Sequence, residues 1–366
     1  MKPTDLGHPR LPGPPALHPD GGTAVVSVRR ADLDADDYTA QLWLVPTDGS
    51  GPPRQLTHGW RDAGPRYSPD GSRLAFVRAG REGGGASGSA IRPQLWVMHT
   101  AGGEPRRLTD HPLGVDGPPV WSPDSTRLAY TARVPEQGRY GTVEDRGPEK
   151  EPPRRITRML YRLDGIGFLQ DRPRQVFVVD ALVPDAEPAQ VTSADTDSGE
   201  VDWSPDGELL AFLSARHETR YEDLRSDVWL CQPDGTELRA LTSGGLSPGQ
   251  PRFGPDGSVV YFSGMQTDGW HDVARNESLW SVPVDGSAPA RRVTDQERYN
   301  VAAPDGKITP TPDGVLFPNE NRGAVELLRV PLDGGEPEVL MAGERQILGA
   351  DRNGGTLVVT VVTPRS

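Results

Sequence analysis

The sequence predicts an all-β protein built from repeated sheets. Three observations favour this class: a recurring four-residue turn, an apolar run after each turn, and abundant Gly and Pro, at 43 and 38 of 366 residues. Turn-rich chains with many short strands are typical of all-β folds. Repeats of roughly 40 to 50 residues that each hold four strands are typical of propeller blades. We therefore expect a seven-bladed β-propeller with four-stranded antiparallel blades.

Each repeat starts with a turn of the Ser-Pro-Asp-Gly type. In such a turn Pro presets φ, Asp bonds back to the backbone and Gly adopts a positive φ. Six copies and a degenerate seventh begin at His18, Ser68, Ser122, Ser204, Gly254, Thr311 and Asp351.

Strand-like segments follow every turn. The first is a continuous apolar run such as Leu74–Val77, which fits a strand buried on both faces. The second carries an apolar-aromatic pair such as Leu95-Trp96, and the repeat closes on Leu-Thr or Val-Thr. These closing pairs lie at 56–57, 108–109, 191–192, 241–242 and 293–294.

The markers give the expected blade boundaries. The blades are placed at about 11–57, 62–109, 114–192, 197–242, 247–294, 298–341 and 346–366. The last unit lacks an aromatic strand and a closing Leu-Thr, and its unpaired edge would be an aggregation hazard. We therefore expect the natural polypeptide to continue beyond Ser366. The alternative for this last unit is a blade that is simply short. The alternative for the whole fold is a solenoid of stacked sheets.

Composition argues against several partners. A net charge of −13 disfavours nucleic acid and anionic membranes. No apolar stretch approaches the length of a membrane span, and residues 1–7 lack the apolar core of a signal peptide. With the single Cys231, these features predict a cytoplasmic protein without disulfides.

The third repeat carries a long arginine-rich insert between Tyr130 and Val176. Residues 135–153 read as a loop, whereas residues 156–165 are predicted as an extra strand or a short helix. Arginine forks match carboxylates, so one hypothesis is that some of these arginines face the channel and hold a peptide carboxylate. The alternative is surface pairing with Glu144, Asp145, Glu149 and Glu151. The candidate substrate-binding arginines are Arg154, Arg155, Arg158 and Arg162.

No catalytic machinery is predicted in this chain. The string Gly85-Ala86-Ser87-Gly88-Ser89 lacks the last glycine of a nucleophile elbow and lies in a low-complexity loop. The seven histidines show no metal-ligand spacing, and Cys231 follows a strand-like Trp-Leu pair that predicts a buried packing role. We expect no catalytic residue, no metal and no cofactor.

The repeat resembles the propeller half of the prolyl oligopeptidase family of serine peptidases, and most closely its acylaminoacyl-peptidase branch. The resemblance rests on the turn Trp203–Gly207, on Ile156-Thr157-Arg158, and on Tyr161–Gly165 leading to Gln175–Asp180. It implies a C-terminal α/β-hydrolase domain in the same polypeptide, with a propeller that admits only short or unfolded peptides. It also suggests that Glu218 and Glu222 bind a peptide amine, as acidic residues do in the dipeptidyl branch.

These observations predict a non-catalytic propeller that gates and docks short peptides for a serine peptidase domain. Its partners would be that domain and short or N-acylated peptides, and homo-oligomer formation is left open. The alternative is a free-standing TolB- or WD-type propeller that binds another protein. A propeller enzyme acting in its own channel would need a metal-binding cluster, for which the sequence offers no candidate.

Overall fold

The computed structural model describes residues 2–81, 90–144, 146–164, 166–267, 274–301 and 307–363. Within these residues the chain is almost entirely β-structure, with two short 3₁₀-helices, η1 (Pro3–Gly7) and η2 (Pro148–Lys150), and no α-helix. None of the described helices has the length and apolar character needed to cross a membrane. The all-β prediction is confirmed.

The first strands form one nine-stranded sheet. Its path runs β1-β3-β4-β6-β7-β8-β9, with β2 paired to β3 and β5 paired to β4. A single parallel bridge, from Ala40 to Arg61, joins β4 to β6. The strands are β1 (Leu11–Pro12), β2 (Ala16–Leu17), β3 (Thr23–Asp32), β4 (Asp37–Pro46), β5 (Arg54–Gln55), β6 (Arg61–Tyr67), β7 (Arg73–Arg81), β8 (Ala90–His99) and β9 (Arg106–Arg107).

Four antiparallel four-stranded sheets follow, and a two-stranded sheet ends the described chain. The third-repeat sheet contains β10 (Val115–Trp121), β11 (Arg127–Arg133), β14 (Arg174–Asp180) and β15 (Ala189–Gln190). The next contains β16 (Ser198–Trp203), β17 (Leu210–Ser214), β18 (Asp227–Cys231) and β19 (Arg239–Ala240). Then come β20 (Leu246–Phe253), β21 (Val259–Gln266), β22 (Ser278–Pro283) and β23 (Arg291–Arg292). The last are β24 (Thr309–Thr311), β25 (Gly314–Asn321), β26 (Ala324–Val330) and β27 (Glu338–Met341), followed by β28 (Gln346–Asn353) and β29 (Thr356–Val362).

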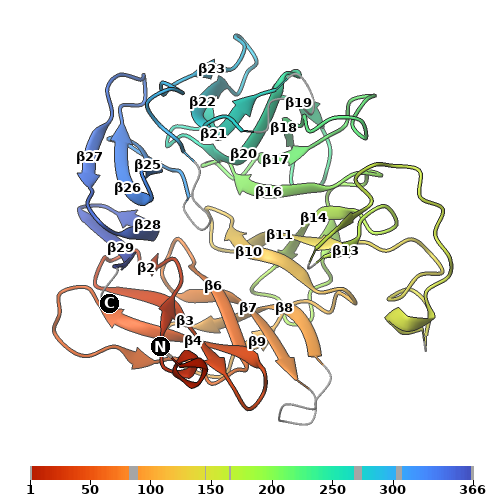
Figure 1. The fold of residues 1–366 in the computed structure, drawn as a ribbon, viewed down its shortest axis with the longest axis horizontal. Helices are drawn as coiled ribbons and strands as arrows, with labels where there is room; N and C mark the ends of the chain where they lie inside the picture. Colours follow the sequence, from red (N-terminus) through yellow and green to blue (C-terminus); the bar gives the residue numbers. More distant parts are fainter. Residues whose placement is uncertain are drawn as a thin grey trace.

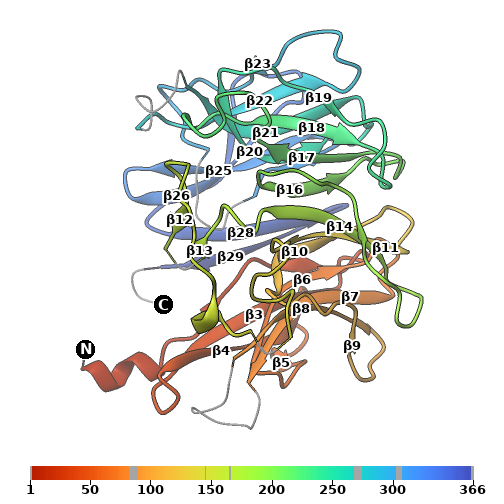
Figure 2. The same ribbon diagram turned by 90° about the vertical axis from the view of Figure 1, so that its right-hand side faces the viewer.

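The sheets lie in sequence order around a common centre, so the last sheet reaches the first (Figure 1). Two hydrogen bonds join them: the Leu17 amide donates to Asp351 Oδ2 at 2.8 Å, and the Asn353 side chain donates to the Pro19 carbonyl. Helix η1 projects beyond the sheets beside the β3–β4 hairpin (Figure 2). The first and last sheets are therefore neighbours in space although they lie at opposite ends of the chain.

The recurring turn has the predicted chemistry. In the second copy the Gly71 amide donates to the Ser68 carbonyl at 2.8 Å, and Gly71 has a φ of +73°. The Ser72 amide donates to Asp70 Oδ1 at 3.0 Å. The Asp side chain thus replaces a backbone acceptor, as expected for an Asx-type turn.

Each of four successive sheets buries an aromatic ring five residues after the glycine position of its turn. Phe76, Tyr130, Phe212 and Phe262 are at most 1% exposed. Adjacent sheets are also linked by an indole: Trp203 Nε1 donates to the Val120 carbonyl at 3.2 Å. The core is therefore a series of apolar layers between neighbouring sheets, because no single sheet covers both of its own faces.

The closing Leu-Thr pairs have a structural role in the described repeats. The Val176 amide donates to Thr192 Oγ1 at 2.9 Å, and Thr192 Oγ1 donates to Gln175 Oε1 at 2.7 Å. The hydroxyl groups of Thr57, Thr109, Thr242 and Thr294 accept the equivalent amide in their own sheets. Thr recurs at this position because a buried amide there needs a short side-chain acceptor.

The long insert adds a small sheet of its own. β12 (Arg162–Leu163) pairs with β13 (Gly167–Phe168), so this part of the insert is strand rather than helix. The part predicted as a loop contains the short η2. The two alternatives left open by the sequence are thereby resolved for the described residues.

Candidate functional site: the arginine-rich insert and the central channel

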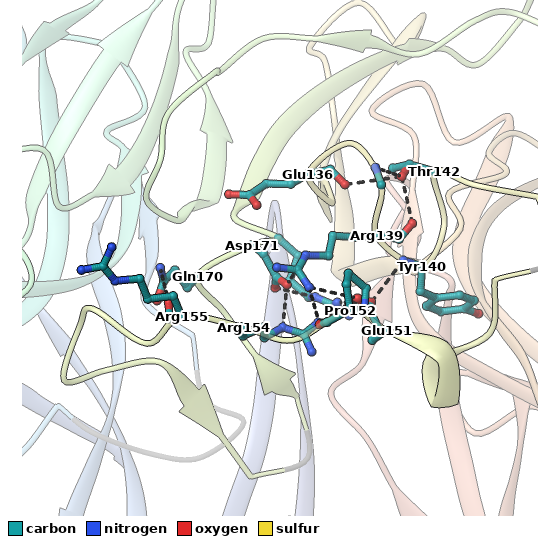
Figure 3. Close-up of polar contacts among 12 residues, drawn as sticks. Glu136, Arg139, Tyr140, Thr142, Glu151, Pro152, Arg154, Arg155, Gln170 and Asp171 are labelled. Atoms are coloured by element: carbon teal, nitrogen blue, oxygen red, sulfur yellow. Dashed lines mark hydrogen bonds and ion pairs between the residues drawn. The ribbon is translucent and has the colours of Figure 1, made fainter.

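The insert is held by a cluster of charged side chains around Asp171 and Glu151 (Figure 3). Asp171, at 4% side-chain exposure, contacts Arg154 Nε at 2.6 Å and Arg139 Nε at 3.0 Å. Glu151 contacts Arg172 at 2.7 Å and Arg154 at 3.3 Å. Burial would raise the pKa of the Asp171 carboxyl, but the hydrogen bond from Arg154 and the charge of Arg172 outweigh it and hold that pKa below its usual value. Arg154 therefore anchors the insert.

Arg158 connects the insert to the loop after β17. Its Nη1 donates to the Asp195 carbonyl at 3.0 Å, and its guanidinium lies 3.8 Å from the centre of the Tyr221 ring. Arg220 from that loop shares Asp195, at 2.8 Å from its carboxylate, and also lies over Tyr221. The insert and the loop that carries Glu218 and Glu222 are thus joined at one acidic residue.

The other predicted substrate-binding residues are exposed. Arg155 points away from the Asp171 cluster (Figure 3), and Arg162 lies over Phe168, which Arg154 also contacts. Glu218 and Glu222 are on the surface of the loop after β17. None of the six predicted residues is among those that line the two cavities described below, and the hypothesis that some of the arginines face the channel stays a prediction. Their role in substrate binding stays a prediction.

The ion pairs offered as the alternative are found in part. Arg154 does pair with Glu151 as that hypothesis named, but its shorter contact is with Asp171, which the sequence did not suggest. Asp145 lies outside the described residues.

Two adjoining cavities lie where the sheets meet. One has a volume of about 440 Å³ and the other about 320 Å³. Residues shared by both linings are Pro14, Arg66, Val120, Arg252 and Lys307. We call this space the central channel, because its walls come from the innermost strands β6, β10, β16, β20 and β28, which lie around the common centre of the sheets (Figure 1). Its charged lining residues are Arg66, Asp116, Arg174, Glu200, Asp202, Arg252, Lys307 and Asp351.

One repeat position supplies much of this lining. It is the residue five places before the glycine position of the turn, on the innermost strand of its sheet. Because the sheets are repeats arranged around one centre, residues at equivalent positions of different repeats line the same central space. The residues at this position in the lining of the smaller cavity are Arg66, Val120, Asp202, Arg252, Thr309 and Gly349.

The innermost strands carry a bulge immediately before this position. The register of β16 against β17 shifts between Gly199 and Asp202, and that of β20 against β21 shifts between Gly249 and Arg252. Glu200 and Gln250 adopt positive φ at these bulges, of 55° and 52°. Such a conformation costs a non-glycine residue about 1–2 kcal/mol. Bulges of this kind re-aim side chains, and here they turn both residues toward the channel.

The channel shifts the protonation equilibria of its own groups. Burial and the charges of Arg66 and Arg252 lower the pKa of Lys307 well below 10.5. Burial also lowers the pKa of Arg66 to about 10. The pKa of Asp202 is raised by burial, in spite of the nearby charge of Arg252. Burial is the largest cause of each shift, so the channel disfavours isolated charges of either sign, and the charges of Arg66 and Arg252 add to the cost of protonating Lys307.

Comparison with known proteins places this fold. No protein-family model matches the chain. Over 219 residues it is 34% identical to the uncharacterized peptidase YuxL of Bacillus subtilis, a match that covers 59% of this chain and 31% of that protein. The acylaminoacyl peptidase of Pyrococcus horikoshii superimposes with a TM-score of 0.70 at 17% identity, over 97% of this chain and 50% of that chain. The β-propeller domain of the Trilobed protease from Pyrococcus furiosus does so with a TM-score of 0.65 at 15% identity, over 97% and 92%.

The chain is a propeller domain related to those of peptidases. It spans about a third of YuxL and half of the P. horikoshii chain. The resemblance inferred from the turn motifs and the long third repeat is confirmed, while the low identity to the solved structures extends it no further than the fold.

Metal-binding groups and the single thiol were the other candidates for chemistry in this chain. No group of three or more His, Cys, Asp or Glu side chains there could hold a metal ion. Cys231 is fully buried as predicted, and burial raises the pKa of its thiol to about 11. The Gly85–Ser89 string lies outside the described residues.

Sequence reasoning missed the channel residues although a signal existed. Attention went to the arginine density of the insert, whereas Arg66 and Arg252 are single arginines in the short strings Gly64-Pro65-Arg66 and Gln250-Pro251-Arg252. Aligning the repeats on the turn glycine and reading the column five places upstream would have found them.

Proposed function

We propose that this propeller is the non-catalytic part of a prolyl oligopeptidase-type serine peptidase, and that it gates and docks short peptides for the hydrolase domain. The observation that carries the proposal is the fold match over 97% of the chain to half of an acylaminoacyl peptidase chain. The identity to a curated peptidase supports it. The partner would be a C-terminal α/β-hydrolase domain of the same polypeptide.

We also propose that the ring has seven blades. The nine-stranded sheet is held together by the single Ala40–Arg61 bridge, and division at that point gives one unit from β1 to β5 and another from β6 to β9. The four four-stranded sheets and the β28–β29 sheet supply the other five units. The hydrogen bonds from Leu17 and to Pro19 would then close the ring between the first and seventh blades.

The shape of the proposed ring supports the gating role. A rigid ring whose inner strands are linked sheet to sheet excludes folded proteins and leaves the channel lining accessible only to small ligands. Such exclusion keeps water and large substrates from a catalytic centre on one face. The ring contributes selection and docking, and the hydrolase domain contributes the chemistry. A cytoplasmic location and the oligomeric state stay predictions.

The proposal is tested with the complete natural polypeptide and with the 366-residue chain. N-acetyl-trialanine p-nitroanilide and an unfolded protein that contains the same sequence serve as substrates. We expect the complete polypeptide to cleave the short substrate at least tenfold faster than it cleaves the unfolded protein. We expect the 366-residue chain to cleave neither substrate. Hydrolysis by the 366-residue chain, or a complete polypeptide without hydrolase activity, would contradict the proposal. The second outcome would favour the free-standing protein-binding propeller.

A further inference from the structure

Three cationic side chains from three different sheets meet in the central channel. Arg66 lies on β6, Arg252 on β20, and Lys307 directly precedes β24. All three line both cavities. Their convergence is a consequence of the repeat, since Arg66 and Arg252 occupy the same position in two repeats.

These cations lack acidic partners among the described residues. The guanidinium of Arg66 donates to the Pro65 carbonyl at 2.7 Å, and that of Arg252 to the Pro251 carbonyl at 2.8 Å. No described carboxylate lies within ion-pair distance of Arg66, Arg252 or Lys307. This contrasts with Arg78, Arg133 and Arg154, each of which pairs with a carboxylate.

The acidic residues of the channel, in contrast, are already engaged. Asp116 pairs with Arg133 at 3.6 Å. Asp202 Oδ2 accepts the Phe253 amide at 3.0 Å, and Asp351 Oδ2 accepts the Leu17 amide at 2.8 Å. Glu200 accepts the Gln250 amide. Glu200, Asp202 and Asp351 therefore hold neighbouring sheets together, and the cations are left with unused donors.

Buried cations without a direct ion pair are unfavourable, because the more distant charges of Asp202 and Asp351 repay their desolvation only in part. An anion placed among the three cations would remove this cost. Two guanidinium forks suit a planar carboxylate, which accepts two parallel N–H bonds. A polyanion is a poorer fit because the chain carries a net charge of −13.

We propose that the central channel binds a carboxylate group of a short peptide between Arg66, Arg252 and Lys307. The identity of the ligand as a peptide rests on the proposed function, whereas the anion site itself rests on the channel geometry. The carboxylate is either the free C-terminus of the peptide or an acidic side chain, and both have the same chemistry.

Binding is expected to be coupled to proton uptake. Burial, and after it the charges of Arg66 and Arg252, disfavour protonated Lys307, whereas the charges of Asp351 and Asp202 favour it. A bound carboxylate adds negative charge beside Lys307 and raises its pKa. Peptide binding should therefore take up a fraction of a proton at a pH between the pKa values of Lys307 in the free and in the bound chain. Calorimetry in buffers of different ionisation enthalpy, repeated over a series of pH values, measures this uptake.

The test is isothermal titration calorimetry on the 366-residue chain, which needs no hydrolysis. The probes are N-acetyl-trialanine, its C-terminal amide, N-acetyl-Ala-Asp-Ala amide, and inorganic phosphate. We expect the free acid to bind at least about tenfold more tightly than its amide, because the carboxylate makes charge-assisted hydrogen bonds. Tight binding of N-acetyl-Ala-Asp-Ala amide as well would support the site and would show that it also accepts the carboxylate of an acidic side chain. Binding of phosphate without either carboxylate peptide would overturn the peptide assignment.

Variants locate the site. Arg66→Gln and Arg252→Gln should each weaken binding of the free acid by about tenfold to a hundredfold. Lys307→Gln should abolish the proton uptake. Arg54→Gln is the matched control, because it removes the same charge from an exposed position outside the channel.

Two results would overturn the proposal: equal affinities of the unmodified chain for the acid and the amide, or unchanged affinity in the Arg252→Gln variant. The comparison of acid with amide uses the unmodified chain, so a variant that fails to fold does not compromise it. Failure of the hydrolysis assay would leave these binding results intact, and the two proposals are thus tested separately.

Discussion

Replacing Thr192 by Val tests whether the closing Leu-Thr pairs stabilise the blades by hydrogen bonding. Thr192 is 3% exposed, Gln175 is 1% exposed and Val176 is fully buried. Val has the shape of Thr, so the substitution removes the hydroxyl without creating a cavity. It leaves the Val176 amide without its 2.9 Å acceptor and Gln175 Oε1 without its 2.7 Å donor.

Each buried group left without a partner costs about 1–3 kcal/mol, so the two together should cost about 3 kcal/mol. With about 2.1 cal/mol/K of unfolding entropy per residue over 366 residues, this lowers Tm by about 4 °C. Scanning calorimetry and urea unfolding measure the change. Thr192→Ser is the control, because it keeps the hydroxyl and loses one methyl group, at about 1 kcal/mol. A Thr192→Val variant as stable as Thr192→Ser would refute the reasoning.

Three further predictions concern charge and backbone conformation. Asp171→Asn should cost about 3 kcal/mol at pH 7, the usual cost of breaking a buried ion pair. The pKa of Asp171 is lowered on folding, so its contribution is present above pH 4 and is lost as the pH falls through the folded-state pKa. Urea unfolding should therefore show a smaller difference from the unmodified chain at pH 2 than at pH 7, and an equal difference would contradict this. Lys307 has a lowered pKa in the folded state, so the unfolded chain binds more protons between that value and 10.5, and stability should rise with pH over this interval. Lys307→Met should remove the contribution of Lys307 to this rise of stability with pH, as measured by Tm over a series of pH values. A Tm that depends on pH as in the unmodified chain would contradict the lowered pKa of Lys307. Arg322 adopts a φ of +51° beside Gly323 at +83° in the β25–β26 hairpin, a turn that favours Asn-Gly. Arg322→Asn should stabilise the chain by about 0.5–1 kcal/mol, and a lower Tm would be the opposite of what relief of strain requires.

The strands were predictable because their markers are local. A turn such as Ser68–Gly71 is specified by the chemistry of four consecutive residues, and the apolar run after it needs no distant partner. The closing Thr was recognisable as a marker for the same reason, although its hydrogen bond to the strand of Val176 became clear only in the structure. The resemblance to peptidase propellers followed from these local motifs.

The site was harder to predict because it is assembled from single residues far apart in sequence. Arg66 and Arg252 are 186 positions apart, and each follows a proline and a bulge that interrupt the alternation of inward and outward side chains. The density of arginines in the insert gave a stronger local signal. Its main acidic partner, Asp171, lies 17 residues from Arg154 on the other side of the β12–β13 hairpin, so nearby glutamates were considered first.

The pairing that joins the first two repeats in one sheet could not be predicted from the sequence either. The Ala40–Arg61 bridge links β4 to β6 through one parallel pair, and it depends on how the short edge strand β5 leaves part of β4 uncovered. Edge pairing of this kind is set by tertiary packing rather than by local propensity.

The most direct test of the account is a crystal structure of the 366-residue chain with N-acetyl-trialanine. The account predicts the peptide carboxylate in the central channel, within hydrogen-bond distance of Arg66, Arg252 and Lys307. A peptide bound only at the insert, against Arg158 or beside Glu218, with no ligand in the channel, would contradict it.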